Sequence, residues 1–261
     1  MVAPAKSKEQ AFEWLIERAL VGNTVEERAK DKGIANFDAQ NPGNENFYWG
    51  RPADLNKELA IDTVRLWSFL NATQSEKLKE YKGKDLAKAL PRQIAKIIST
   101  KGILEVLRKG IDLDNLEGIK LFYPKPSEAD SEESKRLYAE NQFCVTRQQT
   151  FSSTHPGLEI DMVISVNGLP LFTMELKNPW TGQTARYNGI KQYKEERNPK
   201  EPLLNYGRCL AHFTLDKDDV YFTTRLNEGK TFFMPFNQGL PNGLGAGNPV
   251  NEEGYKTSYM W

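Results

Sequence analysis

The sequence predicts an α/β protein with a mixed central β-sheet flanked by helices. Three observations lead to this fold class. The first half of the chain carries apolar residues at helical spacing, the second half carries short β-like apolar runs, and one amphipathic segment separates two groups of these runs. Because strands, one crossover helix and further strands follow one another, we expect a sheet that contains both parallel and antiparallel pairs.

Residues 1–140 are predicted to form a largely helical block that packs on the sheet. In the segment 8–21, apolar residues recur at helical spacing at Phe12, Leu15, Ile16, Ala19 and Leu20. Further helices are expected at 55–70, 75–82, 85–99 and 102–108. Two segments are expected to be irregular, namely a polar loop at 33–52 and a charged, proline-bearing surface excursion at 112–140.

Residues 141–238 are predicted to form the sheet core. Strands are expected at 143–150, 160–166, 171–176, 208–214, 220–225 and 231–236, with one helix at 181–197. Thr181 would cap that helix, and Asn198-Pro199 would end it. Residues 239–261 are glycine- and proline-rich and then aromatic, so we expect an irregular loop and the start of a linker in a longer protein.

The two runs on either side of Asn167-Gly168 read as a hairpin that carries three charged side chains. These are Asp161 in the first run, and Glu175 and Lys177 at the end of the second. A buried charge is costly unless it is paired or binds a metal, and two acids with a lysine suit Mg²⁺ and the hydrolysis of a phosphodiester. The simpler alternative is a solvent-exposed hairpin with an Asp–Lys or Glu–Lys ion pair.

The register of the hairpin separates these alternatives. With a plain two-residue turn, Val166 would pair with Leu169, and Asp161 would pair with Met174 and face away from Glu175. With a longer loop or a β-bulge, Asp161 would lie opposite Glu175, at a Cβ separation of about 5 Å. A metal site therefore requires the shifted register.

These residues resemble a known family. Asp161 with Glu175-Leu176-Lys177 is similar to the motif of PD-(D/E)XK (restriction-endonuclease-like) nucleases, although Ile160 replaces the proline. The sequence ELKNP, followed by a predicted helix ending in QYK, resembles the amino-terminal region of the R (restriction) subunit of type I restriction-modification enzymes. Further resemblances are LAID at 59–62, GILEVLRKG at 102–110, VTRQ at 145–148 and GRCLAHF at 207–213.

The resemblance implies an endonuclease that cuts double-stranded DNA, and the lack of a signal-peptide sequence makes a cytoplasmic setting the expectation. Asp161, Glu175 and the Leu176 carbonyl would hold Mg²⁺, with Mn²⁺ as a substitute, and Lys177 would orient or activate the attacking water. Modification and specificity subunits are the implied partners, and ATP-driven motor domains are implied only for the full-length parent. No P-loop is found here, because Thr224 stands where the first glycine of a motif ending in Gly229-Lys230-Thr231 is required.

The segment after the hairpin is a candidate DNA-contacting surface. Family members carry a Gln-x-x-x-Tyr element there; Tyr193 fits its end, but Gly189 takes the glutamine position, so Gln192 or Gln183 would substitute and a glutamine at 189 would be tolerated. Arg186, Lys194 and Arg197 recur at helical spacing and would hold DNA phosphates, the alternative being a solvated helix face. In the first helix, Glu13 would be either an outer metal ligand or a solvated glutamate.

Composition adds limits but no function. Lys and Arg total 35, as do Asp and Glu, so any DNA-binding surface must come from local clustering of charge. The amino terminus lacks the apolar region of a signal peptide, and Cys144 and Cys209 lie in apolar runs without metal-site spacing. A second function is also possible from the sequence, namely a non-catalytic or partner-dependent assembly module with a degenerate nuclease fold. This alternative predicts that the isolated chain binds no metal.

Overall fold

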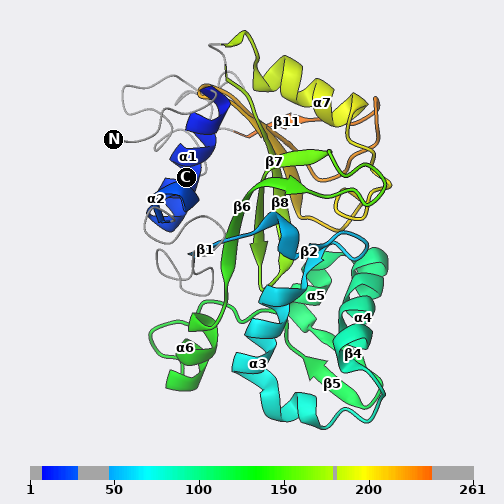
Figure 1. Ribbon diagram of the computed structural model, residues 1–261. Coiled ribbons are helices and arrows are strands. Elements are labelled where there is room, and N and C mark those ends of the chain that lie inside the picture. The colour runs from blue at the N-terminus through cyan, green and yellow to red at the C-terminus, as the bar shows by residue number, and fades with distance from the viewer. Residues whose placement is uncertain (1–7, 29–46, 179–180, 237–261) are drawn as a thin grey trace.

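The computed structural model describes residues 8–28, 47–178 and 181–236. A seven-stranded mixed sheet runs through the molecule, with α1 on one side and α7 on the other (Figure 1). A second group of elements, α3 to α5 with β4 and β5, lies at one end of the sheet (Figure 1). The predicted fold class is confirmed.

The helices have these bounds: α1 Lys8–Val21, α2 Val25–Arg28, α3 Thr63–Lys79, α4 Leu86–Lys101, α5 Ile103–Lys109, α6 Glu132–Ala139 and α7 Ile190–Glu195. Two short helical turns are η2 at Pro52–Asp54 and η4 at Ala185–Gly189. No helix in the described ranges is long and apolar enough to cross a bilayer. The 239–261 prediction lies outside the described residues.

The strands of the main sheet are β1 Phe47–Trp49, β6 Phe143–Thr150, β7 Glu159–Val166, β8 Leu169–Leu176, β9 Ala211–Leu215, β10 Val220–Thr223 and β11 Met234–Pro235. Their order is β1-β6-β7-β8-β9-β10-β11. The pairs β1–β6 and β8–β9 are parallel, and the others are antiparallel. Because a parallel pair needs a crossover, the chain between β8 and β9 places α7 over the sheet, beside the carboxyl end of β8.

The hairpin between β7 and β8 turns at Asn167 and Gly168, whose φ angles are +50° and +82°. Positive φ at both positions is typical of a type I′ turn, the turn that Asn-Gly favours. A Cβ on Gly168 would lie 2.1 Å from the Asp62 carbonyl oxygen, so only glycine allows this approach. The Gly168 carbonyl in turn accepts the backbone N–H of Asp62. The turn is thereby fixed to the start of α3.

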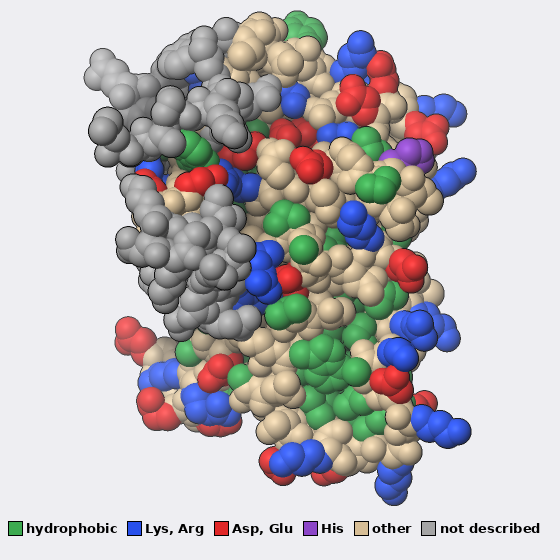
Figure 2. Space-filling view, viewed as in Figure 1, with side chains coloured by type: hydrophobic (Ala, Val, Ile, Leu, Met, Phe, Trp, Pro, Cys, Tyr) green, Lys and Arg blue, Asp and Glu red, His purple; other side chains and the backbone are tan. Residues whose placement is uncertain are grey.

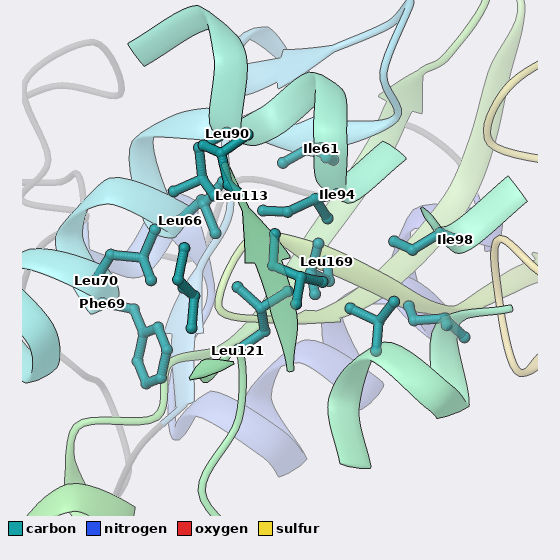
Figure 3. Packing of buried hydrophobic residues seen from close by; sticks show 14 of the residues in the cluster. Ile61, Leu66, Phe69, Leu70, Leu90, Ile94, Ile98, Leu113, Leu121 and Leu169 are labelled. Atoms are coloured by element: carbon teal, nitrogen blue, oxygen red, sulfur yellow. The ribbon is translucent and has the colours of Figure 1, made fainter. Parts of the chain in front are cut away.

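A large apolar cluster holds the α3–α5 lobe to this end of the hairpin. Figure 3 shows Leu169 among side chains of α3 and α4, such as Leu66 and Ile94. Hydrophobic burial of this kind contributes about 25 cal/mol per Å² of apolar surface, which makes it the main favourable term in docking the lobe. Glu175 lies near the opposite end of β8.

Three local predictions are wrong. Residues 55–62 are not helical, because Asp62 caps α3 through the backbone N–H of Arg65; instead β2 Leu55–Asn56 pairs with β3 Ile61–Asp62. The excursion at 112–140 contains β5 Leu116–Ile119, paired with β4 Ile111–Leu113, and also α6. The loop predicted at 33–52 ends in β1, which pairs with β6.

Candidate active site

A β-bulge sets the register of the β7–β8 hairpin. Val166 pairs with Leu169 across the two-residue turn, but the register shifts between Ser165 and Ile164, so that Met162 pairs with Met174. Continued by one residue, this register sets Asp161 opposite Glu175. The structure therefore has the tight turn of one sequence-based alternative and the bulge of the other, and the shifted register that a metal site requires is present.

Glu175 is fully buried within the sheet. Its Oε1 accepts a hydrogen bond from Arg197 Nε at 2.6 Å, and its Oε2 has no hydrogen-bond partner among the described residues. Burial raises the pKa of Glu175 to about 8, and the charge of Asp161 adds to this rise, while Arg197 and Lys177 oppose it. The carboxylate thus has one oxygen tied and one oxygen available.

Asp161 and Lys177 complete the group. Asp161 Oδ2 accepts the backbone N–H of Leu176 at 2.7 Å and lies 3.7 Å from Lys177 Nζ. The Lys177 ammonium is itself buried and donates to the Leu176 carbonyl at 3.1 Å. Because a carbonyl oxygen has two lone pairs, this contact leaves the Leu176 oxygen able to accept a second partner. Two carboxylates, a carbonyl and an ammonium therefore meet at the end of β8.

A cleft of about 400 Å³ opens onto this group. It is lined by Asp161, Lys177, Gln183, Asn188, Lys191, Gln192 and Glu196. Both glutamines that were candidates for the displaced Gln-Tyr element thus line the cleft. Lys191, which was not predicted, is an exposed cation of α7 that lines the cleft. Gln192 Oε1 is buried without a hydrogen-bond partner in the described part of the chain.

The helix predicted at 181–197 is shorter and begins later. Thr184, not Thr181, caps it through the backbone N–H of Tyr187, and the π-turn η4 precedes α7. Asp216 fixes the start of this segment by accepting the Ala185 N–H at 2.7 Å. The π-turn accommodates one extra residue, which accounts for the loss of the simple helical spacing used in the prediction.

Gly189 is a close-packing position. A Cβ there would lie 1.7 Å from Thr214 Oγ1 on β9, so the backbone of η4 approaches the sheet more closely than any side chain allows. The expectation that glutamine would be tolerated at 189 is therefore wrong. Tyr193 is buried beneath α7, with its hydroxyl 2.8 Å from Thr173 Oγ1, and it does not reach the surface.

The three cations predicted to hold phosphates lie in different places. Arg197 is buried against Glu175 and also donates to the Glu159 carbonyl, so its assignment to DNA is corrected. Arg186 is exposed and Lys194 is half-buried, but neither lines the cleft. The spacing was misleading because Ile190, Tyr193 and Arg197 lie on the face of the segment that packs on the sheet.

Two polar residues from outside the hairpin adjoin the site. Glu13 of α1 is buried, and burial together with the charge of Asp161 raises its pKa to about 7; the solvated alternative is wrong. Gln148 of β6, with φ +50°, donates its side-chain amide to Glu13. Gln148 stands opposite Asp161, between the pairs Arg147–Met162 and Gln149–Ile160. In the sequence, only the resemblance of VTRQ at 145–148 to the family pointed to Gln148.

Comparison with known families decides the relationship. A family model described as the type I restriction enzyme R protein N terminus (HSDR_N) matches residues 51–231, which is more than two thirds of the chain. The chain belongs to this family. No curated protein matched the sequence. Within the HSDR_N match lie Asp161, Glu175 and Lys177, the cleft glutamines and the α3–α5 lobe, whereas Glu13 lies outside it.

The donor set of this HSDR_N domain fits a hydrated magnesium ion. No group of three His, Cys, Asp or Glu side chains in the described ranges is arranged as a metal cage. Mg²⁺ does not need one, because it is commonly held by one or two carboxylates and retains several waters. The buried Oε2 of Glu175, which has no hydrogen-bond partner among the described residues, is the observation on which this fit rests.

Proposed function

We propose that this domain is a magnesium-dependent endonuclease that hydrolyses phosphodiester bonds of double-stranded DNA. One observation carries the proposal, namely the bulge-shifted register that brings Asp161 opposite Glu175, with Lys177 Nζ 3.7 Å from Asp161 Oδ2. A plain hairpin with surface charges would need neither the bulge nor the burial of Glu175. Membership of the type I restriction R protein family supports the same activity.

In this proposal each residue has a defined task. Asp161, Glu175 Oε2 and the Leu176 carbonyl would hold Mg²⁺, with Mn²⁺ able to replace it. When bound, the ion would place positive charge on the phosphate and lower the pKa of an attacking water. Lys177 stabilises the developing negative charge and orients that water from within the cleft. The open cleft, bordered by Gln183 and Gln192, admits the DNA backbone.

Glu13 would contribute to the metal site indirectly, from a position next to Asp161. Its carboxylate is held by Gln148 and is close enough to Asp161 to raise its own pKa. This position suits an outer ligand that binds a metal-bound water, which is one of the two alternatives that the sequence left open for Glu13. The modification and specificity subunits of a restriction complex are the proposed partners, and they would supply the choice of DNA site.

The test is metal binding and cleavage by the same protein. Calorimetric titration with Mg²⁺ or Mn²⁺ should show binding, and supercoiled plasmid should be nicked or linearised in the presence of the metal. Asp161→Asn should lower the rate at least about 100-fold, since it removes a charge needed for the ion. Glu159→Gln is the matched control, because Glu159 is an exposed acid on the same strand. Parental cleavage by Asp161→Asn would refute the assignment.

One contact favours the partner-dependent alternative. Arg197 neutralises Glu175 within the sheet, as expected if the site were held in an inactive arrangement until a partner or DNA binds. The two possibilities differ in metal affinity. An autonomous nuclease binds the ion as an isolated chain, whereas a partner-dependent module binds it only in the assembled complex.

A further inference from the structure

The exposed face of α4 carries positive charge without acidic residues, in a chain without net charge. Between Asp85 and Glu105 there is no acidic residue, while Lys88, Arg92 and Lys96 follow one another at four-residue intervals. All three side chains are exposed. Because residues i and i+4 lie above one another on a helix, the three cations form one line, which we call the α4 stripe.

The α4 stripe differs from the other charged helix faces. On α6, Lys135 and Arg136 each pair with an acid three residues before them, as does Lys79 on α3. On α4, Arg92 and Lys96 have no ion pair among the described residues, and Lys88 has only an exposed contact with its capping residue Asp85. Exposed pairs of that kind contribute little and exchange readily. The α4 stripe is thus an uncompensated line of positive charge.

The rest of α4 shows why this line faces solvent. Leu90, Ile94 and Ile98 are buried in the lobe core on the opposite face of the helix. Lys and Arg side chains project along the edge of the molecule where α4 and α5 lie (Figure 2). The packed face holds the helix rigidly, so the cations are presented at fixed spacing.

The chain that follows α7 leads from the region of the cleft to the end of α4. Leu203 and Leu204 pack in the same cluster as Tyr193 of α7. A few residues on, the Gly207 carbonyl accepts the backbone N–H of Ile103, at the joint between α4 and α5. The segment 203–207 therefore runs from the cluster beneath α7 to the joint between α4 and α5.

The lobe that carries the α4 stripe and the cleft lie toward opposite ends of β8. The α4 lobe docks at the Leu169 end of β8, and Glu175 lies six residues along the strand, about 20 Å away at 3.3 Å per residue. The α4 stripe itself covers about 12 Å of helix, a length over which one DNA strand presents three to four phosphates. A small anion could not use both regions, whereas a duplex could.

We infer that the α4 stripe binds the phosphate backbone of duplex DNA at a distance from the bond that is cut. This inference rests on the proposed function for the direction of the DNA, but binding itself needs no metal. The contacts are to phosphates and carry no sequence information. They would hold a duplex along the side of the domain and deliver it to the cleft.

The test is the salt dependence of DNA affinity in EDTA, which excludes cleavage. Fluorescence anisotropy with a labelled 20-bp duplex compares the parent chain with Lys88→Ala/Arg92→Ala/Lys96→Ala. Three lost phosphate contacts should lower the affinity at least about 10-fold at low salt and flatten the log–log salt slope by about 2.7. The exchange variant Lys88→Arg/Arg92→Lys/Lys96→Arg should retain both values, because the contacts need charge alone.

The control removes the same charge elsewhere. Lys125→Ala/Lys135→Ala/Arg136→Ala neutralises three cations on the α6 segment and should leave affinity and slope close to those of the parent. Equal losses in the two triple variants, or no loss in the α4 variant, would overturn the inference and leave the α4 stripe as a solvated face or a surface for an acidic protein. Weaker binding by the α4 variant of a chain that never cleaves would support the inference while refuting the proposed function.

Discussion

Arg197 and Glu175 form an ion pair inside the sheet, with Nε and Oε1 2.6 Å apart and both side chains buried. The cation that the sequence placed on a DNA-binding face thus neutralises one of the two acids of the site. It also stacks near Phe151, at 5.9 Å from the ring centroid. Arg197 therefore belongs to the architecture of the site.

We expect Arg197→Met to destabilise the domain by about 3–5 kcal/mol, because it leaves the Glu175 carboxylate buried without its partner. Glu175→Gln should cost a comparable amount by leaving the guanidinium unpaired. In the double variant the loss should be smaller than the sum of the two. Urea unfolding of metal-free protein at pH 8.5, above the raised pKa of Glu175, measures all three. Additive losses would show that the pair is not coupled.

Asp161→Asn should stabilise the metal-free domain, unlike the changes at Arg197 and Glu175. The amide oxygen can still accept the Leu176 N–H, while the charge that raises the pKa values of Glu175 and Glu13 is gone. We expect metal-free protein to gain about 0.5–1 kcal/mol in stability while cleavage is lost. Thermal unfolding with and without Mg²⁺ tests this, and Glu159→Gln should stay within about 0.5 kcal/mol of the parent. A variant that unfolds more readily than the parent would contradict the repulsion.

Gly189→Ala should lower stability by about 1–3 kcal/mol, since the added methyl overlaps Thr214 and the helix must shift away from β9. Thr214→Ala removes the nearest atom and should recover part of the loss in the double variant. Cleavage should fall with Gly189→Ala, because Gln192 moves with the helix. Gly182→Ala at an open position of the same segment, where φ is +78°, provides a comparison in which strain arises without a clash. A fully active, stable Gly189→Gln protein would contradict the close packing.

The pH dependence of stability has a separate source at the start of α3. Burial raises the pKa of Asp62 from 3.8 to about 6, although the backbone N–H of Arg65 favours its charged form. The native state therefore binds a proton more tightly than the unfolded state, and this contribution to stability is lost as pH rises from about 4 through 6.

Asp62→Asn should remove that loss while keeping the helix cap, which asparagine forms as well as aspartate. It should be more stable than the parent at pH 7.5, by on the order of 1–2 kcal/mol, and no more stable at pH 4. Asp62→Ala also loses the helix cap, so it should be less stable than Asp62→Asn at both pH values. Urea unfolding at the two pH values distinguishes the variants. Equal losses for Asn and Ala at pH 7.5 would refute the argument.

The sequence predicted the elements whose signals are local. The helix at 8–21, the strand at 143–150 and the Asn167-Gly168 turn follow from hydrophobic period and turn chemistry, and all three are confirmed. Residues 55–62 were missed because their apolar residues fit a helix, whereas the contact of Asp62 with Gly168 is formed by residues more than a hundred positions apart.

The residues of the candidate site also fall into those that the sequence predicts and those that depend on tertiary packing. Asp161, Glu175 and Lys177 could be chosen because charge inside apolar strands is unusual, and the register alternatives could be enumerated. The burial of Glu13 and Arg197 could not be read from spacing, since each depends on which element covers it. Lys191 was missed because the predicted stripe follows the face of the segment that packs on the sheet, whereas Lys191 lies on the exposed side that lines the cleft.

The bulge in β8 imposes a parity rule on the hairpin. Thirteen residues separate Asp161 from Glu175, and with a two-residue turn an odd count is what sets the two acids on the same face. Removal or addition of one residue anywhere between them would turn one acid to the α1 side, whereas changes of two residues would preserve the face. Insertions and deletions in this hairpin can therefore keep the two acids together only if they change its length by an even number of residues, although single substitutions remain possible at each position.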